Sequence, residues 1–151
     1  MPTRKHVCEI ELSVSPERVF ELLITPSAIR GWWSATRAIV LPKRGGTWAA
    51  VWGADEDDPD YVAVATLSIF DPPRRLKLSN MQYLAKSGPL PFESSAMTTD
   101  YFIEPRSAGA LLRVVQEGFP EDSSADDFYA SCEKGWRDTF EGIRRFLASN
   151  P

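Results

Sequence analysis

The first clear pattern in the chain is a strict alternation of apolar and polar positions over residues 7–14. Cys8, Ile10, Leu12 and Val14 fall on one side, with glutamate and serine between them. A period of two residues is typical of a strand with one buried and one exposed face. The pattern therefore predicts a half-buried strand near the start of the chain.

Two short helices are predicted directly after this strand. Ser15 can cap a helix, Pro16 suits the first helical position, and Glu17 complements the positive end of the helix dipole. Pro26 ends this first helix, and a second short helix is expected from Ser27 to Trp32. The chain thus leaves its first strand through helices and not through a hairpin.

Six further apolar stretches of strand length follow, separated by turn residues. They cover residues 34–41, 47–52, 61–70, 75–83, 97–104 and 111–117, with Gly, Pro or Asp clusters between most of them. Strands in series with short connections favour antiparallel pairing between neighbours. We therefore expect one meandering antiparallel sheet.

The last segment has a helical period. From Ser124 onward, apolar side chains recur at spacings of three and four, at Phe128, Cys132, Trp136, Phe140, Ile143 and Leu147. A lone amphipathic helix of about six turns must cover a sheet, because its apolar stripe has no other partner. Gly135 weakens such a helix by about 1 kcal/mol relative to Ala, so its place near the stripe hints at close approach to a strand or a ligand.

Composition narrows the class of protein. The 151 residues suit a single domain, and a net charge of −4 disfavours nucleic-acid binding, which needs a basic face. No apolar run is long enough to span a membrane. Two isolated cysteines, Cys8 and Cys132, and a start without a signal-peptide pattern lead us to expect a cytoplasmic protein.

Four stretches of the sequence resemble one known family. They are residues 14–20 continuing to Arg30-Gly31-Trp32-Trp33, the Gly45–Trp48 segment, residues 70–76, and Gly118-Phe119-Pro120 with the Gly135-Trp136 helix. In their residues and in their order along the chain, they look like the heat-shock protein 90 ATPase activator homologues of the SRPBCC superfamily. This resemblance implies an α+β helix-grip (START-like) fold, with a curved sheet of six or seven strands around a long C-terminal helix.

The resemblance also implies a cavity. Relatives bind lipids, polyketides, hormones or other hydrophobic molecules, and a few are cyclases or hydrolases. The eukaryotic co-chaperone that names the family carries a separate N-terminal domain, which residues 1–6 are too few to form. A chaperone partner is therefore the weakest of the implied partners, and the oligomeric state, a homodimer included, stays open.

Strand parity selects candidate ligand-binding residues. Trp48, Ala50 and Trp52 share one face of their strand, and Thr99 and Tyr101 share a face with Gln116 if residues 97–117 form a hairpin. Leu76, Leu78, Asn80 and Gln82 share a face of the fifth strand. Aromatic walls with few polar groups are typical of ligand pockets. The candidates are Trp33, Trp48, Trp52, Asn80, Thr99, Tyr101, Gln116 and Trp136. The alternative is that the polar members satisfy backbone groups at the sheet rim and that Trp33 and Trp136 are core residues.

Catalytic chemistry finds little support. His6, the only histidine, precedes the first predicted strand and is expected to be an exposed terminal residue, so no Ser-His-Asp or Cys-His arrangement can be built. We expect neither metal nor cofactor, since the acidic loop at residues 55–60 departs from the calcium-loop pattern. Glu117 is the best remaining candidate for a buried acid or base. Tyr83, Phe92 and the Pro-containing loop between them are predicted to form a lid.

Three hypotheses for function follow from these observations. The first is a module that binds a small hydrophobic or aromatic molecule without catalysis. The second is a cyclase- or hydrolase-type enzyme that uses a buried carboxylate and a bound water. The third is a co-chaperone-type interaction domain, which rests on the family name alone.

Overall fold

A computed structural model describes residues 2–151 of the chain. The elements, in chain order, are β1 (Thr3–Leu12), α1 (Pro16–Ile24), α2 (Pro26–Trp33), β2 (Arg37–Val40), β3 (Thr47–Trp52), β4 (Tyr61–Asp71), β5 (Arg75–Ala85), β6 (Thr98–Arg106), β7 (Gly109–Pro120), a 3₁₀ turn (Ser123–Ala125) and α3 (Asp126–Ser149). Each helix and strand predicted from the sequence is present, with shifted ends.

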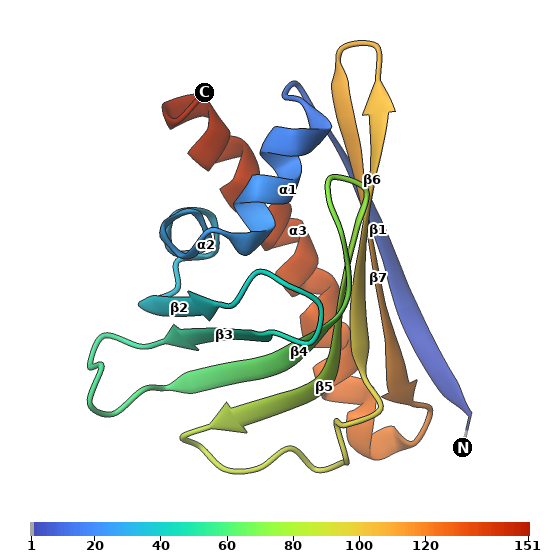
Figure 1. The fold of residues 1–151 in the computed structure, drawn as a ribbon. Helices are drawn as coiled ribbons and strands as arrows, with labels where there is room; N and C mark the ends of the chain where they lie inside the picture. Colours follow the sequence, from blue (N-terminus) through green and yellow to red (C-terminus); the bar gives the residue numbers. More distant parts are fainter. Residues whose placement is uncertain (1) are drawn as a thin grey trace.

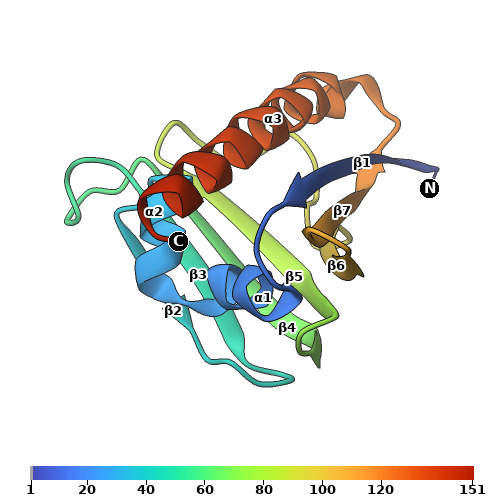
Figure 2. The same cartoon turned by 90° about the horizontal axis from the view of Figure 1, so that it is seen from above.

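The seven strands form one antiparallel sheet in the order β1-β7-β6-β5-β4-β3-β2. The strands after α2 pair as a meander, and β1 closes the far edge against β7. The sheet curves around α3, and α1 and α2 lie near the C-terminal end of that helix (Figure 1). Viewed from above, α3 crosses the concave side of the sheet (Figure 2). The α+β helix-grip fold predicted from the sequence is confirmed.

Helix α2 packs on the C-terminal half of α3, and α1 packs against α2 and against strands β6 and β7 at that end of the grip. The Ser15 hydroxyl accepts a hydrogen bond from the Arg18 amide at 3.2 Å, which caps α1 as predicted. A Cβ on Gly142 of α3 would overlap the Trp32 carbonyl oxygen, and one on Gly31 of α2 would overlap the Phe146 ring. Glycine at both positions therefore lets the two helices meet closely.

Strand β5 contains a bulge that reverses its parity at Asn80. Val64 pairs with Gln82 and Thr66 with Ser79, so Asn80 and Met81 together oppose one residue of β4. Asn80 adopts the left-handed conformation with φ 54°, which Asn tolerates better than most residues. The predicted continuous face is therefore wrong: Leu76 and Leu78 face inward, but Met81 takes the place predicted for Asn80 and Gln82.

The start of β1 also differs from the prediction. The strand begins at Thr3, because β7 continues through Gly118 to Pro120 and pairs with it. His6 therefore lies within the strand, is only 6% exposed and stacks on the Tyr129 ring with centroids 3.8 Å apart. The expectation of an exposed terminal histidine is wrong, since pairing across the sheet extends the strand beyond its apolar pattern.

The 3₁₀ turn before α3 is capped by Asp122, and α3 itself begins at Asp126 without a side-chain cap. Ser124 lies in the 3₁₀ turn before the helix, and the Asp122 carboxylate accepts a hydrogen bond from its amide at 2.8 Å. This bond lowers the pKa of Asp122. No helix within residues 2–151 is long and apolar enough to cross a membrane.

Candidate functional site: an aromatic cavity between the sheet and the long helix

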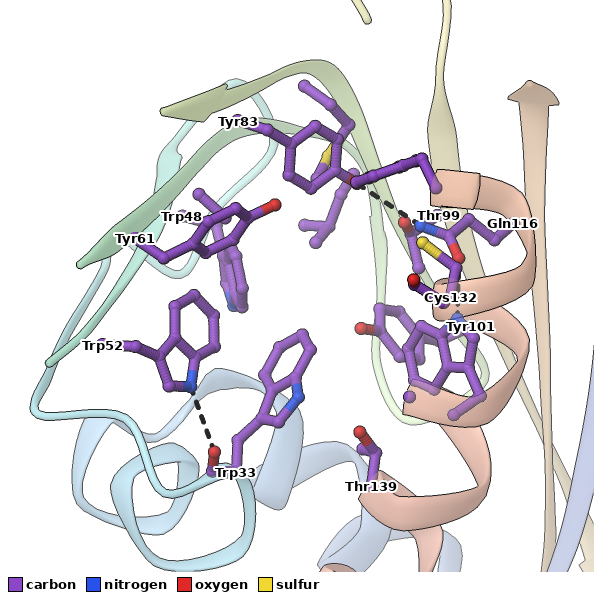
Figure 3. A pocket seen from close by; sticks show the side chains of 17 residues that line it. Trp33, Trp48, Trp52, Tyr61, Tyr83, Thr99, Tyr101, Gln116, Cys132 and Thr139 are labelled. Atoms are coloured by element: carbon purple, nitrogen blue, oxygen red, sulfur yellow. Dashed lines mark hydrogen bonds between the residues drawn. The ribbon is translucent and has the colours of Figure 1, made fainter. Parts of the chain in front are cut away.

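A cavity of about 390 Å³ lies between the concave face of the sheet and the N-terminal half of α3. Its volume is within the range of small-molecule sites. Side chains from α2, β3, β4, β5, β6, β7 and α3 line it (Figure 3). They are Trp33, Trp48, Trp52, Tyr61, Ala63, Leu78, Met81, Tyr83, Thr99, Tyr101, Gln116, Phe128, Ser131, Cys132, Gly135, Trp136 and Thr139.

Indole rings from three elements meet at one side of the cavity. The centroid of the Trp33 ring lies 5.7 Å from Trp48, 5.3 Å from Trp52 and 6.1 Å from Trp136. The Trp52 indole donates a hydrogen bond to the Trp33 carbonyl at 3.1 Å, which fixes the end of α2 against β3. These contacts between the protein's own groups fix the aromatic wall of the cavity.

A short chain of hydrogen bonds follows the opposite wall. The Trp136 indole donates to Gln116 Oε1 at 2.7 Å, and Gln116 Nε2 donates to the Tyr83 hydroxyl at 3.4 Å. Gln116 is 5% exposed, so both ends of its amide are used in a buried setting. The amide has one orientation, because an indole N–H is a donor only and must face the carbonyl oxygen.

The remaining polar groups of the cavity are neutral hydroxyls and a thiol. Within residues 2–151, no hydrogen bond engages the hydroxyl of Tyr61 or Tyr101, and both point into the open space in Figure 3. Burial raises the pKa of Tyr61, Tyr83 and Tyr101. Burial also raises the pKa of the Cys132 thiol to about 12. All four groups are therefore protonated at neutral pH.

No charged side chain is among the residues that line the cavity. Glu117, the sequence candidate for a buried acid or base, alternates with Gln116 on β7 and belongs to the other face of that strand. Within residues 2–151, no cluster of three or more His, Cys, Asp or Glu side chains could hold a metal ion. What the cavity offers a bound molecule is ring surface and neutral hydrogen-bonding groups.

The structure brings seven of the eight candidate residues to this one cavity. They are Trp33, Trp48, Trp52, Thr99, Tyr101, Gln116 and Trp136. Their placement follows the predicted parity, since Thr99 pairs with Gln116 and Tyr101 with Val114 in the β6–β7 hairpin. Asn80 is exposed and does not line the cavity, because the bulge in β5 turns it outward.

Sequence reasoning missed several lining residues on β4, β5 and α3. Tyr61 and Ala63 follow from the parity of β4, once Ala63 is paired with Ala50 of β3. The bulge at Asn80 moves Met81 and Tyr83 to the inner face of the sheet. The pattern of apolar and polar residues does not reveal this bulge. Gly135 lines the cavity and a Cβ there would meet open space, so no strand lies close against it; contact with a ligand stays a prediction.

Aromatic side chains gather at the end of the cavity near the start of α3. The Phe128 ring lies 5.4 Å from Tyr83 and 5.4 Å from Phe92 of the loop between β5 and β6. Phe92 is not among the lining residues, so it covers Phe128 from outside. Tyr83 itself belongs to β5 and lines the cavity, and the lid predicted from Tyr83, Phe92 and the intervening loop stays a prediction.

Known structures share this fold at low sequence identity. Protein MLL2253 from Mesorhizobium loti aligns with a TM-score of 0.78 and 21% identity, over 98% of this chain and 99% of that one. The AHSA1-like protein from Aeromonas hydrophila aligns with a TM-score of 0.75 and 16% identity, over 97% and 94%. CalU16 from Micromonospora echinospora gives 0.68 and 16%, over 96% and 76%. At these identities the likeness shows the fold.

The family follows from the sequence. No curated protein matches the chain. The model of one family, described as activator of Hsp90 ATPase homolog 1-like protein, matches residues 13–148, which take in every element from α1 to the last turn of α3. The chain therefore belongs to the activator of Hsp90 ATPase homolog 1-like family.

Proposed function

We propose that this protein binds a small, uncharged, largely aromatic molecule in the cavity between its sheet and α3. The observation that carries the proposal is a space of about 390 Å³, walled by tryptophan and tyrosine rings. Protein interiors are normally close-packed, so a space of this size beside four tryptophans is a feature that packing alone does not favour. Ring surface supplies affinity, and the few hydroxyls and the Gln116 amide supply orientation.

The lining of the cavity, which contains no charged side chain, indicates that the ligand is uncharged. A carboxylate or ammonium group that enters the cavity loses its hydration and meets no opposite charge among the lining residues. A neutral molecule avoids this penalty. The proposal therefore excludes fatty acids and other anions unless their charged end remains outside in solvent.

Gly135 provides a sharp test. A Cβ at this position would meet no atom within 4 Å, apart from its chain neighbours and the backbone of its own helix. A Gly135→Leu side chain would thus extend into the cavity and occupy ligand space. Gly135→Ala is the matched control, because it makes the same change in helix propensity and fills little space.

The experiment is native mass spectrometry of the three proteins, as purified and after incubation with 2-acetylnaphthalene as a neutral aromatic probe. We expect a non-covalent adduct, lost on denaturation, in the parent and in Gly135→Ala, and its loss in Gly135→Leu. A parent protein that acquires no adduct in either condition would contradict the proposal. An adduct that survives in Gly135→Leu would place binding elsewhere on the molecule.

The other two hypotheses predict different results. An enzyme would release a changed molecule, whereas a binding module returns its ligand intact when the adduct is denatured. A co-chaperone would retain the chaperone in a pull-down whether or not Gly135→Leu fills the cavity.

A further inference from the structure

One wall of the cavity has hydrogen bonds whose direction is fixed by chemistry. The Trp136 indole can only donate, so the atom that faces it at 2.7 Å must be the carbonyl oxygen of Gln116. The amide nitrogen of Gln116 then faces Tyr83 and can only donate. The Tyr83 hydroxyl is therefore the acceptor in this contact.

The proton of the Tyr83 hydroxyl is left without a partner. A phenol carries one O–H donor besides its acceptor lone pairs. Among residues 2–151, the hydroxyl takes part in the contact with Gln116 and in no other hydrogen bond. Tyr83 lines the cavity, and its hydroxyl faces the wall of Gln116 and Thr99 beside the open space (Figure 3). Burial keeps the group protonated, since it raises the pKa of Tyr83.

Tyr83 differs in this respect from the other two tyrosines of the cavity. The hydroxyls of Tyr61 and Tyr101 make no hydrogen bond within the described chain, so each can donate to a ligand or accept from it. The Tyr83 hydroxyl already accepts a hydrogen bond from Gln116, so toward a ligand it acts as a donor. A bound molecule finds one donor of fixed direction there, surrounded by rings and free of charge.

We propose that the molecule bound in this cavity is a neutral aromatic carbonyl compound whose carbonyl oxygen accepts a hydrogen bond from the Tyr83 hydroxyl. For this one hydrogen bond Gln116 and Trp136 are positioning residues, since they act on the carbonyl oxygen through the Tyr83 hydroxyl. A carbonyl conjugated to a ring keeps its acceptor oxygen in the ring plane and adds no charge, which matches flat aromatic walls with a single directed donor. This inference rests on the proposed function and names the ligand class for the same site.

The test uses three probes of nearly equal shape. 2-Acetylnaphthalene carries the carbonyl, 2-isopropylnaphthalene replaces it with a hydrocarbon group, and 2-naphthoate replaces it with an anion. Kd is measured for each by quenching of tryptophan fluorescence. Because the hydrocarbon leaves water more readily than the ketone, the decisive quantity is how the ratio of their Kd values changes on mutation.

Tyr83→Phe removes the hydroxyl and keeps the ring. We expect it to weaken binding of 2-acetylnaphthalene about 3- to 10-fold, the usual range for one hydrogen bond, and to leave 2-isopropylnaphthalene within about twofold. Gln116→Met should give a smaller change of the same ratio, because the Tyr83 proton is then free to turn away. Tyr101→Phe is the comparison variant, because it removes a cavity hydroxyl whose direction no hydrogen bond fixes, and it should change the ratio less than Tyr83→Phe does. Thermal unfolding of each variant confirms that it folds.

The outcomes separate this inference from the function on which it rests. If the ketone and hydrocarbon bind but Tyr83→Phe leaves their ratio unchanged, the carbonyl assignment is overturned and the binding function stands. Tightest binding of 2-naphthoate to the parent would overturn the assignment of a neutral ligand. If none of the probes binds to the parent, the proposed function itself fails, and this inference fails with it.

Discussion

Gly135 and Gly142 lie seven residues apart on the same side of α3, yet they face different surroundings. At Gly142 a Cβ would overlap the Trp32 carbonyl oxygen, whereas at Gly135 it would enter open space. The C-terminal half of the helix packs against α2, with Phe140 and Ile143 in the core. The N-terminal half borders the cavity. One amphipathic helix thus completes a close-packed core at one end and leaves a space at the other.

The comparison shows what the fold needs and what it leaves free. Close contact between α2 and α3 fixes the end of the grip, so stability depends on the absence of a side chain at Gly142. Nothing in the packing requires the absence of one at Gly135, where alanine would strengthen the helix. A glycine that costs stability without relieving a clash is consistent with a ligand that uses the space.

The largest expected effect is a loss of stability at high pH, and it comes from the three tyrosines that line the cavity. Burial raises the pKa of Tyr61, Tyr83 and Tyr101 above the ordinary value of 10.0. The unfolded chain therefore releases these protons first. Their contribution to stability is complete below pH 10 and falls as the pH rises toward the folded-state values.

At pH 11 we expect the free energy of unfolding to be lower than at pH 8 by about 3 kcal/mol from these three phenols. This is less than their simple sum, because Tyr61 and Tyr83 are only partly buried and solvent screens their charges. Urea unfolding at both pH values measures it. The control is the triple variant with phenylalanine at all three positions, which should lose much less. An equal loss in both proteins would refute the account.

The next largest effect is at the close-packed end. Gly142→Ala should lower the free energy of unfolding by about 2–3 kcal/mol, because the new methyl group meets a backbone oxygen that cannot rotate away. Thermal and urea unfolding measure the change. A neutral or stabilising substitution would show that α2 and α3 do not meet as closely as described.

A smaller effect is expected at the bulge that admits Met81 and Tyr83 to the cavity wall. Asn80→Val should destabilise the protein by about 1–2 kcal/mol, because a β-branched residue is poorly accommodated at φ 54°. Asn80→Gly is the matched control and should be close to neutral. Equal stability of the two variants would argue against the left-handed conformation at this position.

The smallest effect returns to the cavity end of α3. Gly135→Ala should raise the free energy of unfolding by up to about 1 kcal/mol, the difference in helix propensity, because the added methyl group meets nothing. Urea unfolding beside Gly142→Ala measures the contrast directly. Destabilisation by Gly135→Ala would mean that the space beside this glycine is filled.

The sequence predicted the site where strand parity is unbroken. The β6–β7 hairpin keeps one register from Thr98 to Arg106, so Thr99, Tyr101 and Gln116 were placed on one face correctly. The fold class also followed, because alternation along the strands and the long apolar stripe of α3 are both properties of local sequence.

Asn80 and His6 were predicted wrongly because their placement depends on features that the local sequence pattern does not contain. Asn80 faces outward because a bulge adds one residue to β5, and a bulge leaves no mark in an apolar alternation. His6 is buried because β7 extends far enough to pair with it and Tyr129 of α3 covers it. Both depend on partners distant in sequence.

The central claim is that the space beside Gly135 is a ligand site, and a titration of 2-acetylnaphthalene into the parent, Gly135→Ala and Gly135→Leu proteins tests it most directly. Tryptophan fluorescence reports binding, since the indoles of Trp33, Trp48, Trp52 and Trp136 line the cavity. We predict that the parent and Gly135→Ala bind with Kd values within about threefold, and that Gly135→Leu binds at least about tenfold more weakly while it unfolds no earlier than the parent. Equal binding by all three folded proteins would contradict the claim.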